Sequence, residues 1–375
     1  MRLVFSCLWE SFSVCDTIGL LCTGKDLGGS DMKKIGITLG IILGILVLGI
    51  GAGAFYVNHL LDSTMNQMVT TDSVTKEEVG VAEEVIQKEE ETKVMNIAVF
   101  GLDRNGNGSD GRSDAMKVLS LDTKHNIAKV TSFQRDTLIY IPGDIQDFDK
   151  LNHPYAYGGA KLAMQTINYN FDLDLTRYVS FNFDAIEKII DTSGGIELEI
   201  LSKEVSYMNG YISSSENKIT SAGLQHLNGA QAMGYMRIRY ADSDYVRMDR
   251  QTNVMKAIFT QLKSVSYTQL LNLLNECLPY VETNLTKDEI ISLGMDALKV
   301  DLSNIEQYQV PSQGYADINH SVSYKGYSPL YVMNSYQDLV KELHQNIYGE
   351  ADYQPSATVL ETEAAIYEKF GYTQK

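Results

Sequence analysis

The hydrophobic and polar positions divide the chain into a membrane-spanning run, an acidic segment and a long mixed region. Residues 35–57 are apolar and carry no charge. A helix rises about 1.5 Å per residue, so this run spans the roughly 30 Å apolar core of a bilayer. Lys33 and Lys34 precede the run, and the next charge after it is Asp62. Because positive residues favour the cytoplasmic side, we predict a single-pass protein of the cell membrane, with residues 1–34 cytoplasmic and the rest of the chain extracellular.

A cleaved signal peptide is the alternative explanation of this run, but residues 35–57 exceed the usual length of a signal-peptide apolar core. Gly36, Gly40 and Gly44 share one face of the predicted transmembrane helix. A ladder of small residues lets two helices approach closely, so the sequence also permits a homodimer through this segment.

The first 31 residues show no clear periodicity and precede a second methionine, Met32. Gly28 and Gly29 can be encoded as GGAGGA, which resembles a bacterial ribosome-binding site shortly before the codon for Met32. We therefore expect translation to start at Met32, so that residues 1–31 would be an extension that results from a wrongly assigned start codon. A peptide spanning residues 20–31 in the native protein would contradict this expectation.

Beyond the apolar run, local patterns predict one folded domain between two polar segments. Residues 58–93 are acidic and predict a solvated stalk, and residues 349–375 predict a polar C-terminal tail. Residues 94–348 predict strands at 94–103, 117–123, 128–134, 137–143, 177–183 and 196–200, and helices at 158–171, 184–195, 228–239, 246–265, 268–277 and 286–299. This alternation predicts an α/β or α+β domain, with a central mixed sheet flanked by helices on both faces.

Composition narrows the functional classes. The formal net charge of −17 argues against nucleic acid as a partner, because nucleic-acid binding depends on a positive surface that neutralises phosphates. Of the four cysteines, only Cys277 lies beyond residue 22, so the long mixed region offers neither an internal disulfide nor a cysteine metal site. We expect Cys277 to be a small buried hydrophobic residue.

Arginine is concentrated in one short stretch. The chain has nine arginines, and four of them, Arg237, Arg239, Arg247 and Arg250, fall within residues 235–251. The planar, permanently charged guanidinium group bonds two phosphate oxygens at once, so such clustering is typical of phosphate recognition. Arg247 and its i+4 neighbour Gln251 share a helix face, whereas Arg250 points elsewhere, and we expect it to pair with Asp249 or a neighbour. A salt-bridge network without a ligand is the alternative.

A second block of charged residues lies at predicted strand ends. Asp103 follows a buried strand, Arg112 and Asp114 follow a glycine-rich loop, and Arg135 ends another strand. Sites on α/β sheets are built at strand ends, so these side chains are expected to converge. Two carboxylates there can hold a hard cation such as Mg²⁺, with phosphate oxygens completing its coordination.

Several motifs occur together in one order: GLD, GRSDAM, QRDT, DKLNHPYAYGG, LNGAQAMGYMRIR and RMDRQ. In order, spacing and flanks, this set resembles the LytR–CpsA–Psr family over roughly residues 94–265. The resemblance implies a single extracellular domain after one membrane helix, in the envelope of a Gram-positive cell. It implies an enzyme that transfers a glycopolymer, such as teichoic acid or capsular polysaccharide, from a polyprenyl-pyrophosphate carrier to a peptidoglycan hydroxyl.

The resemblance also implies roles for individual residues. Asp103 and Asp114 would bind Mg²⁺, or Mn²⁺ in its place. The pyrophosphate would be held by Arg112, Arg135, Arg237, Arg239, Arg247, Gln251, Lys150 and Asn152. Asp103, Arg112 and Arg135 would take part in catalysis, and Asp244 would orient an arginine or help deprotonate the acceptor.

The sequence departs from the family pattern at a few positions. Gln134 stands where a proline is frequent, and Tyr240 stands where a histidine is frequent. Ser243 and Val246 occupy a stretch in which glycines are frequent. These departures affect loop geometry and acceptor choice more than the charged groups. Two other functions stay open. The same pocket could act as a polyprenyl-pyrophosphate phosphatase, or the chain could be a non-catalytic regulator that binds an envelope lipid.

Overall fold

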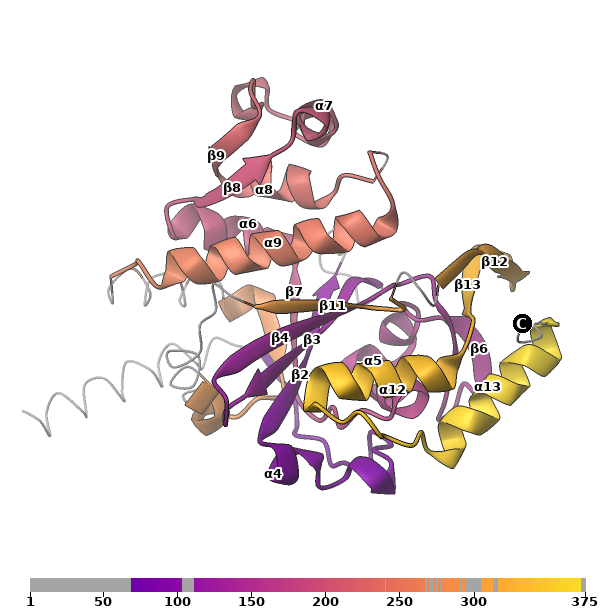
Figure 1. The fold of residues 1–375 in the computed structure, drawn as a ribbon. Coiled ribbons are helices and arrows are strands. Elements are labelled where there is room, and N and C mark those ends of the chain that lie inside the picture. The colour runs from indigo at the N-terminus through magenta and orange to yellow at the C-terminus, as the bar shows by residue number, and fades with distance from the viewer. Residues whose placement is uncertain are drawn as a thin grey trace, which may run out of the picture. The chain divides into compact units, whose positions relative to one another are not determined.

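A seven-stranded mixed sheet forms the centre of the structure (Figure 1). The computed structural model describes residues 69–371 apart from 103–110, 240, 267–268, 270–272, 274–275, 277, 291, 294–304 and 313–315. In spatial order the strands are β1 (Val69–Thr70), β10 (Val281–Thr283), β7 (Tyr178–Asn182), β2 (Val94–Leu102), β3 (Ser113–Asp122), β4 (Ile127–Phe133) and β11 (Glu306–Val310). The strands β2, β3 and β4 form an antiparallel meander, whereas β7 runs parallel to β2 and β11 parallel to β4.

Helices cover both faces of this sheet. On one face, α5 (Pro154–Phe171), α12 (Tyr336–Tyr348) and α13 (Ala357–Phe370) complete the main hydrophobic core. The other face meets α9 (Asp244–Leu262). The alternation of β3 explains the two layers, because Met116 and Val118 face the main core while Leu119 and Leu121 belong to the opposite cluster. The predicted fold class, a mixed sheet between helices, is confirmed.

A smaller lobe, residues 183–238, is inserted between β7 and α9. It contains α6 (Phe183–Thr192), β8 (Ile196–Ile200), α7 (Ser202–Gly210), the short helix η2 (Ser215–Asn217), β9 (Gly223–Leu227) and α8 (Gly229–Met236). These elements have their own hydrophobic cluster, which includes the fully buried Ile190, Ile196 and Leu227. Figure 1 shows α9 lying between this lobe and the central sheet.

Two β-hairpins lie beside the sheet. The first joins β5 (Leu138–Ile141) to β6 (Asp147–Lys150), and the second joins β12 (Ala316–Tyr324) to β13 (Tyr327–Met333). The backbone N–H of Tyr331 donates to the carbonyl of Asp136 at 2.9 Å, which fixes the second hairpin to the segment leading into the first.

The segment expected to be a solvated stalk packs on the domain from residue 69 onward. Strand β1 pairs with β10, and Val79 and Val85 are fully buried in the main core. The remaining elements of this region are η1 (Glu83–Val85) and α4 (Lys88–Thr92), and η3 (Leu278–Tyr280) precedes β10. The prediction failed because the acidic residues dominate the pattern, while a few valines between them face the core.

The expected polar tail, residues 349–375, is also wrong as far as residue 371, because it contains α13. The side chain of Ser356 accepts from the backbone N–H of Val359 and so caps this helix. Asp172 accepts hydrogen bonds from the backbone N–H and the hydroxyl of Ser356, at 2.7 and 2.6 Å. Val359 and Ile366 are buried in the main core. Two well-placed apolar residues and a cap therefore make this polar sequence a packed helix.

The predicted transmembrane run 35–57 and the predicted start at Met32 lie outside the described residues. Within the described part of the chain, none of the helices combines the length and hydropathy needed to cross a bilayer.

Candidate functional site

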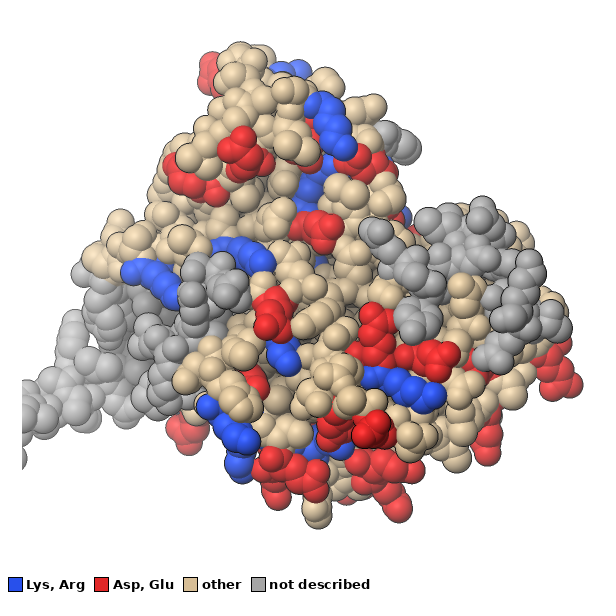
Figure 2. Space-filling view, in the orientation of Figure 1, with Lys and Arg blue, Asp and Glu red and all other residues tan. Residues whose placement is uncertain are grey.

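A polar pocket of about 530 Å³ opens at one end of the central sheet. It is lined by Arg112, Asp114, Arg135, Asp136, Lys150, Asn152, His153 and Arg239. Four of these side chains are cationic and two are carboxylates, so the pocket carries an excess of positive charge in an acidic protein. The face of the molecule shown in Figure 2 has acidic and basic side chains mixed over its surface.

Strand pairing explains why residues distant in sequence meet here. Leu102 at the end of β2 pairs with Ser113 at the start of β3, and Met116 of β3 pairs with Phe133 at the end of β4. Asp114, near the start of β3, and Arg135, just after β4, are therefore neighbours. Of the strand-end side chains expected to converge, Arg112, Asp114 and Arg135 line one pocket, while Asp103 lies outside the described residues.

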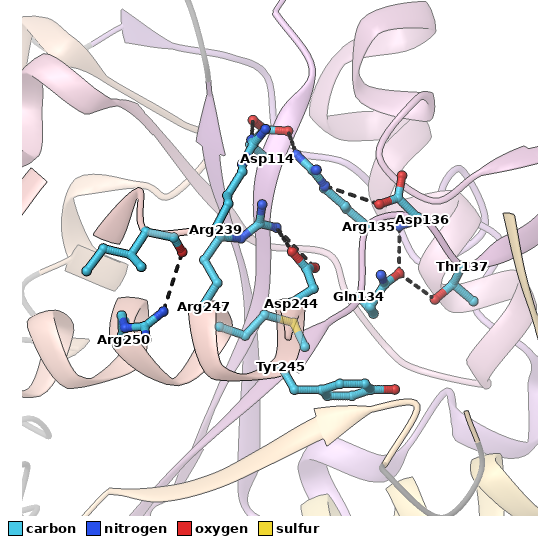
Figure 3. A network of polar contacts seen from close by, with 12 residues as sticks. Asp114, Gln134, Arg135, Asp136, Thr137, Arg239, Asp244, Tyr245, Arg247 and Arg250 are labelled. Atoms are coloured by element: carbon cyan, nitrogen blue, oxygen red, sulfur yellow. Dashed lines mark hydrogen bonds and ion pairs between the residues drawn. The ribbon is translucent and has the colours of Figure 1, made fainter. Parts of the chain in front are cut away.

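Asp114 holds two arginines on the pocket wall (Figure 3). Its Oδ1 accepts from Nη1 of Arg135 at 2.9 Å, and its Oδ2 lies 3.3 Å from Nη2 of Arg239. Arg239 follows α8 and is 45% exposed. A guanidinium group that bonds carboxylate oxygens in this way also has the shape to bond phosphate oxygens, and Asp114 fixes the orientation of two such groups.

The end of β6 and the segment after it supply further residues of the pocket lining, Lys150, Asn152 and His153. Lys150 Nζ lies 2.6 Å from Oδ1 of Asp136, whose Oδ2 lies 3.4 Å from Nε of Arg135. The backbone N–H of Asn152 donates to the carbonyl of Arg135 at 3.2 Å, and that of Leu151 donates to Thr137 at 3.0 Å. These bonds hold the segment carrying Lys150 and Asn152 against the loop that follows β4.

Gln134 anchors the turn that carries Arg135. Its buried side-chain oxygen accepts from the backbone N–H of Asp136 at 2.7 Å and from the hydroxyl of Thr137 at 3.4 Å (Figure 3). The glutamine that replaces a frequent family proline therefore supplies side-chain hydrogen bonds that hold this loop.

The charges of the pocket are strongly coupled. Burial opposes the charged form of Arg135, but the carboxylates of Asp114, Asp136 and Asp244 outweigh it and raise the pKa of Arg135. Arg247 differs, because burial, reinforced by the positive charges of Arg135 and Arg239, lowers its pKa despite the carboxylate of Asp244. The pocket therefore concentrates positive charge that an anionic ligand would stabilise.

Three residues expected at the site lie on α9, behind the pocket wall. Arg247 is buried and pairs with Asp244 at 2.8 Å (Figure 3). Gln251, one turn further along the helix, is also buried. The structure brings these side chains close to the pocket, but they do not line it, and the carboxylate of Asp244 is engaged by Arg247.

Three other expectations have different outcomes. Asp103 lies outside the described residues. Arg237 caps the end of α8 and is exposed, and its charge acts on Glu187 of α6 rather than in the pocket lining. Arg250 is buried and bonds Glu204 at 2.7 Å and also Asp242, so it is ion-paired as expected. The carboxylate of Asp249 instead accepts from the side-chain amide of Gln309.

His153, part of the DKLNHPYAYGG motif, was not among the predicted site residues. The structure places it in the pocket lining, buried, with its Nδ1 at 2.8 Å from Oδ1 of Asp149. Asp136 was also not predicted as a pocket residue. The spacing of Asp149 and His153 was the only available signal, but i, i+4 contacts are typical within helices, whereas Asp149 lies in β6 and His153 is the residue before α5.

The pocket supplies some of the carboxylate ligands that a divalent cation needs. Within the described residues, no three His, Cys, Asp or Glu side chains form a metal-binding cluster. Mg²⁺ usually binds one or two carboxylates and completes its coordination with water and substrate phosphates. Asp114 supplies one such carboxylate at the wall of the pocket.

Comparison with known proteins gives one consistent result. A polyisoprenyl-teichoic acid–peptidoglycan teichoic acid transferase TagU from Bacillus cereus is 30% identical over 287 residues, which cover 76% of this chain and 89% of the relative. The TagU of Bacillus subtilis is 29% identical over 318 residues, covering 84% and 96%. Among solved structures, TagT bound to LIIa-WTA superposes with a TM-score of 0.55 and 25% identity, covering 68% of this chain and 91% of TagT.

The family profile agrees with the motifs. The profile of the LytR_cpsA_psr family matches residues 56–341, which include every residue of the pocket. The chain therefore belongs to the LytR_cpsA_psr family.

Proposed function

We propose that this chain is a phosphotransferase that moves an anionic glycopolymer, such as teichoic acid or capsular polysaccharide, from a polyprenyl-pyrophosphate carrier to peptidoglycan. The observation that carries the proposal is the pocket, where Arg112, Arg135, Lys150 and Arg239 surround a space of about 530 Å³. A cationic pocket of this size suits a pyrophosphate group. The names of the TagU relatives and the structure of TagT bound to LIIa-WTA supply the substrate class.

The chemistry requires charge stabilisation more than a covalent enzyme intermediate. The acceptor hydroxyl oxygen forms a bond to the glycan-bearing phosphorus, and the bond from that phosphorus to the bridging oxygen breaks. The electron pair leaves with the polyprenyl phosphate. Because negative charge grows on the leaving phosphate, cations placed around it stabilise the transition state. The pyrophosphate is already activated, so the reaction needs no further energy source.

We propose that Asp103 and Asp114 also hold Mg²⁺ or Mn²⁺ when the substrate is bound. Such a cation would neutralise phosphate charge and polarise the phosphoryl group. Arg135 and Arg239, which now share the carboxylate of Asp114, would then turn to the substrate oxygens.

The proposed location follows from the same chemistry. The carrier lipid lies in the membrane, and we propose that residues 35–57 anchor the chain there with the pocket on the outer side. The glycine ladder of this segment would allow two anchors to pair.

The test is a transfer assay with full-length protein, Mg²⁺, a synthetic polyprenyl-pyrophosphate glycan and peptidoglycan oligomers. We expect glycan attached to the oligomers, and roughly 100- to 1000-fold lower kcat/KM for Arg135→Ala, by analogy with the loss of one oxyanion donor. Lys150→Ala should also lower kcat/KM. Lys161→Ala is the matched control, because Lys161 forms a similar ion pair with Glu78 outside the pocket lining. EDTA should abolish transfer and Mg²⁺ should restore it.

The other outcomes separate the alternatives. Free glycan phosphate without attachment would identify a polyprenyl-pyrophosphate phosphatase. Binding of the lipid without any turnover would favour a non-catalytic regulator. Equal activity in Arg135→Ala and Lys161→Ala would show that this pocket is not the site.

A further inference from the structure

The transfer leaves one proton without an assigned acceptor, because the attacking hydroxyl must lose it. Three carboxylates that the structure describes near the pocket are already engaged: Asp114 by two arginines, Asp136 by Lys150, and Asp244 by Arg247. Each of these carboxylates already has a cationic partner in place of a reacting group. The pocket lining also contains His153.

His153 is oriented by a buried carboxylate. Its Nδ1 lies 2.8 Å from Oδ1 of Asp149, and the two side chains are 2% and 1% exposed. The backbone N–H of Lys150 donates to the same oxygen at 2.8 Å, and the hydroxyl of Tyr157 donates to Oδ2 at 2.8 Å. These bonds outweigh burial, which acts in the opposite direction, and lower the pKa of Asp149. An ionised Asp149 requires a proton on Nδ1 of a neutral His153.

That tautomer leaves a lone pair on Nε2, the atom that would accept a proton. Nε2 of His153 is buried and has no hydrogen-bond partner among the described residues. Buried polar atoms nearly always have partners, so an orphaned one calls for an explanation such as a catalytic role. An imidazole fixed by a carboxylate through Nδ1, with Nε2 left to face a reacting group, is the arrangement that general-base catalysis uses.

Aromatic residues and cations surround the imidazole. The ring of Tyr327, at the start of β13, packs edge-on against it with centroids 4.5 Å apart, and the ring of Tyr157 lies at 6.0 Å. The guanidinium of Arg112 lies over the same Tyr327 ring at 5.8 Å, and Lys150 is a further cation in the pocket. Arg112 therefore connects a phosphate-binding position to the ring that covers His153.

We propose that His153, oriented by Asp149, is the general base that accepts the proton of the acceptor hydroxyl. The hydroxyl proton moves to Nε2 as the oxygen bonds to phosphorus. The bond to the polyprenyl phosphate breaks, and the imidazolium later returns the proton to water. The inference rests on the proposed function and assigns the deprotonation role to a residue other than Asp244.

The experiment compares wild type, His153→Gln and Asp149→Asn in the transfer assay over pH 5 to 9, with Tyr157→Phe as the matched control for the hydrogen-bond network. We expect kcat to fall about 100-fold or more in His153→Gln, the usual effect of losing a general base. Wild-type kcat should fall on the acid side as the imidazole becomes protonated, and that fall should be absent in His153→Gln. Asp149→Asn should lower kcat, and Tyr157→Phe should lower it less. Binding of a polyprenyl-pyrophosphate analogue should change less than threefold.

A second variant separates catalysis from folding. His153→Ala should regain part of its kcat when imidazole is added, which a residue that only supports the loop would not do. Active wild type with an unchanged pH profile in His153→Gln, or no rescue by imidazole, would overturn the role of His153 and leave the proposed function standing. Absence of transfer by wild type itself would instead remove the proposed function, and this inference with it.

Discussion

At the scale of single residues, one residue type has two roles within a short stretch. Arg239 reaches the pocket with its side chain half exposed, whereas Arg250 is buried against Glu204 and Asp242. The sequence predicted an arginine cluster and an ion pair for Arg250. The sequence did not predict that Arg239 lines the pocket and Arg237 does not. The directions of these two side chains depend on how the end of α8 is placed relative to the sheet.

A buried lysine near the pocket is a second residue-scale feature. Lys117 of β3 donates to the hydroxyls of Ser132 and Thr252, at 2.6 and 2.9 Å, and lies 3.4 Å from the carbonyl of Met248. Burial lowers the pKa of Lys117 from its ordinary 10.5 to about 7, and the charge of Arg247 acts in the same direction. The nearby carboxylate of Asp249 opposes this shift without cancelling it.

This lysine predicts a pH-dependent stability. Below pH 7 the folded and unfolded chains both carry the proton, so the full cost of burying the charge is present. Above pH 7 the folded protein loses the proton first, and the cost fades. We expect the stability of Lys117→Met relative to wild type to fall by up to about 1.4 kcal/mol per pH unit between pH 7 and 9.

Urea unfolding at pH 6, 7, 8 and 9 measures this difference. Lys161→Met is the matched control, since Lys161 is 50% exposed and no such trend is expected there. A difference for Lys117→Met that stays constant across the series would mean that Lys117 does not lose its proton in the folded state.

At the scale of elements, the strands and helices of the middle of the chain were predictable from local pattern. The strand expected at 196–200 is β8, and the helix expected at 246–265 overlaps α9. The predictions failed where few apolar residues carry the packing, in the segments that contain Val79 and Val359. The polarity of a segment alone does not predict that two or three of its apolar side chains pack against a distant part of the fold.

The helix α13 gives a direct test at this scale. Truncation after Pro355 removes Val359 and Ile366 from the core and the Ser356 hydrogen bonds to Asp172. Because burying one such apolar side chain is worth about 1.5–3 kcal/mol, we expect a loss of roughly 3–6 kcal/mol in the free energy of unfolding. Truncation after Gly371 is the control and should change little. Thermal or urea unfolding measures both, and equal stability of the two truncated chains would contradict the packing of α13.

At the scale of the whole molecule, the structure has two main hydrophobic clusters of unequal size. The main core lies under the central sheet, and a smaller one holds the lobe of residues 183–238 together. The strand β2 is largely buried along its length, whereas β8 alternates buried and exposed residues. A region that buries fewer apolar side chains unfolds locally at a lower free energy than a region that buries more.

We therefore expect native-state hydrogen exchange to separate the two regions. In increasing urea, amides of β8 and β9 should exchange through an opening of lower free energy than amides of β2, β3 and β4. Mass spectrometry of proteolytic peptides measures this. A single opening free energy for both regions would show that α9 and the buried Arg250 couple them into one cooperative unit.

The strand order of the sheet was beyond reach of the sequence. Local patterns predicted the strands β2, β3, β4 and β7, but only β2, β3 and β4 follow one another directly in both the chain and the sheet. The pairings of β11 with β4 and of β10 with β7 join segments more than 90 residues apart. The pocket was predictable to a similar degree. The charged residues at predicted strand ends indicated its place, whereas the position of His153 in its lining could be recognised only from the fold.

This strand order also governs how the protein is made. Phe133 completes β4, but its outer neighbour β11 ends only at Val310, 177 residues later. At about 5–20 residues per second, a ribosome takes roughly 10–40 s to supply it. Until then, the nascent chain has an open β-strand edge that can pair with other chains. Yield in a producing cell should therefore depend on chaperones that shield this edge, more than on the stability of the finished fold.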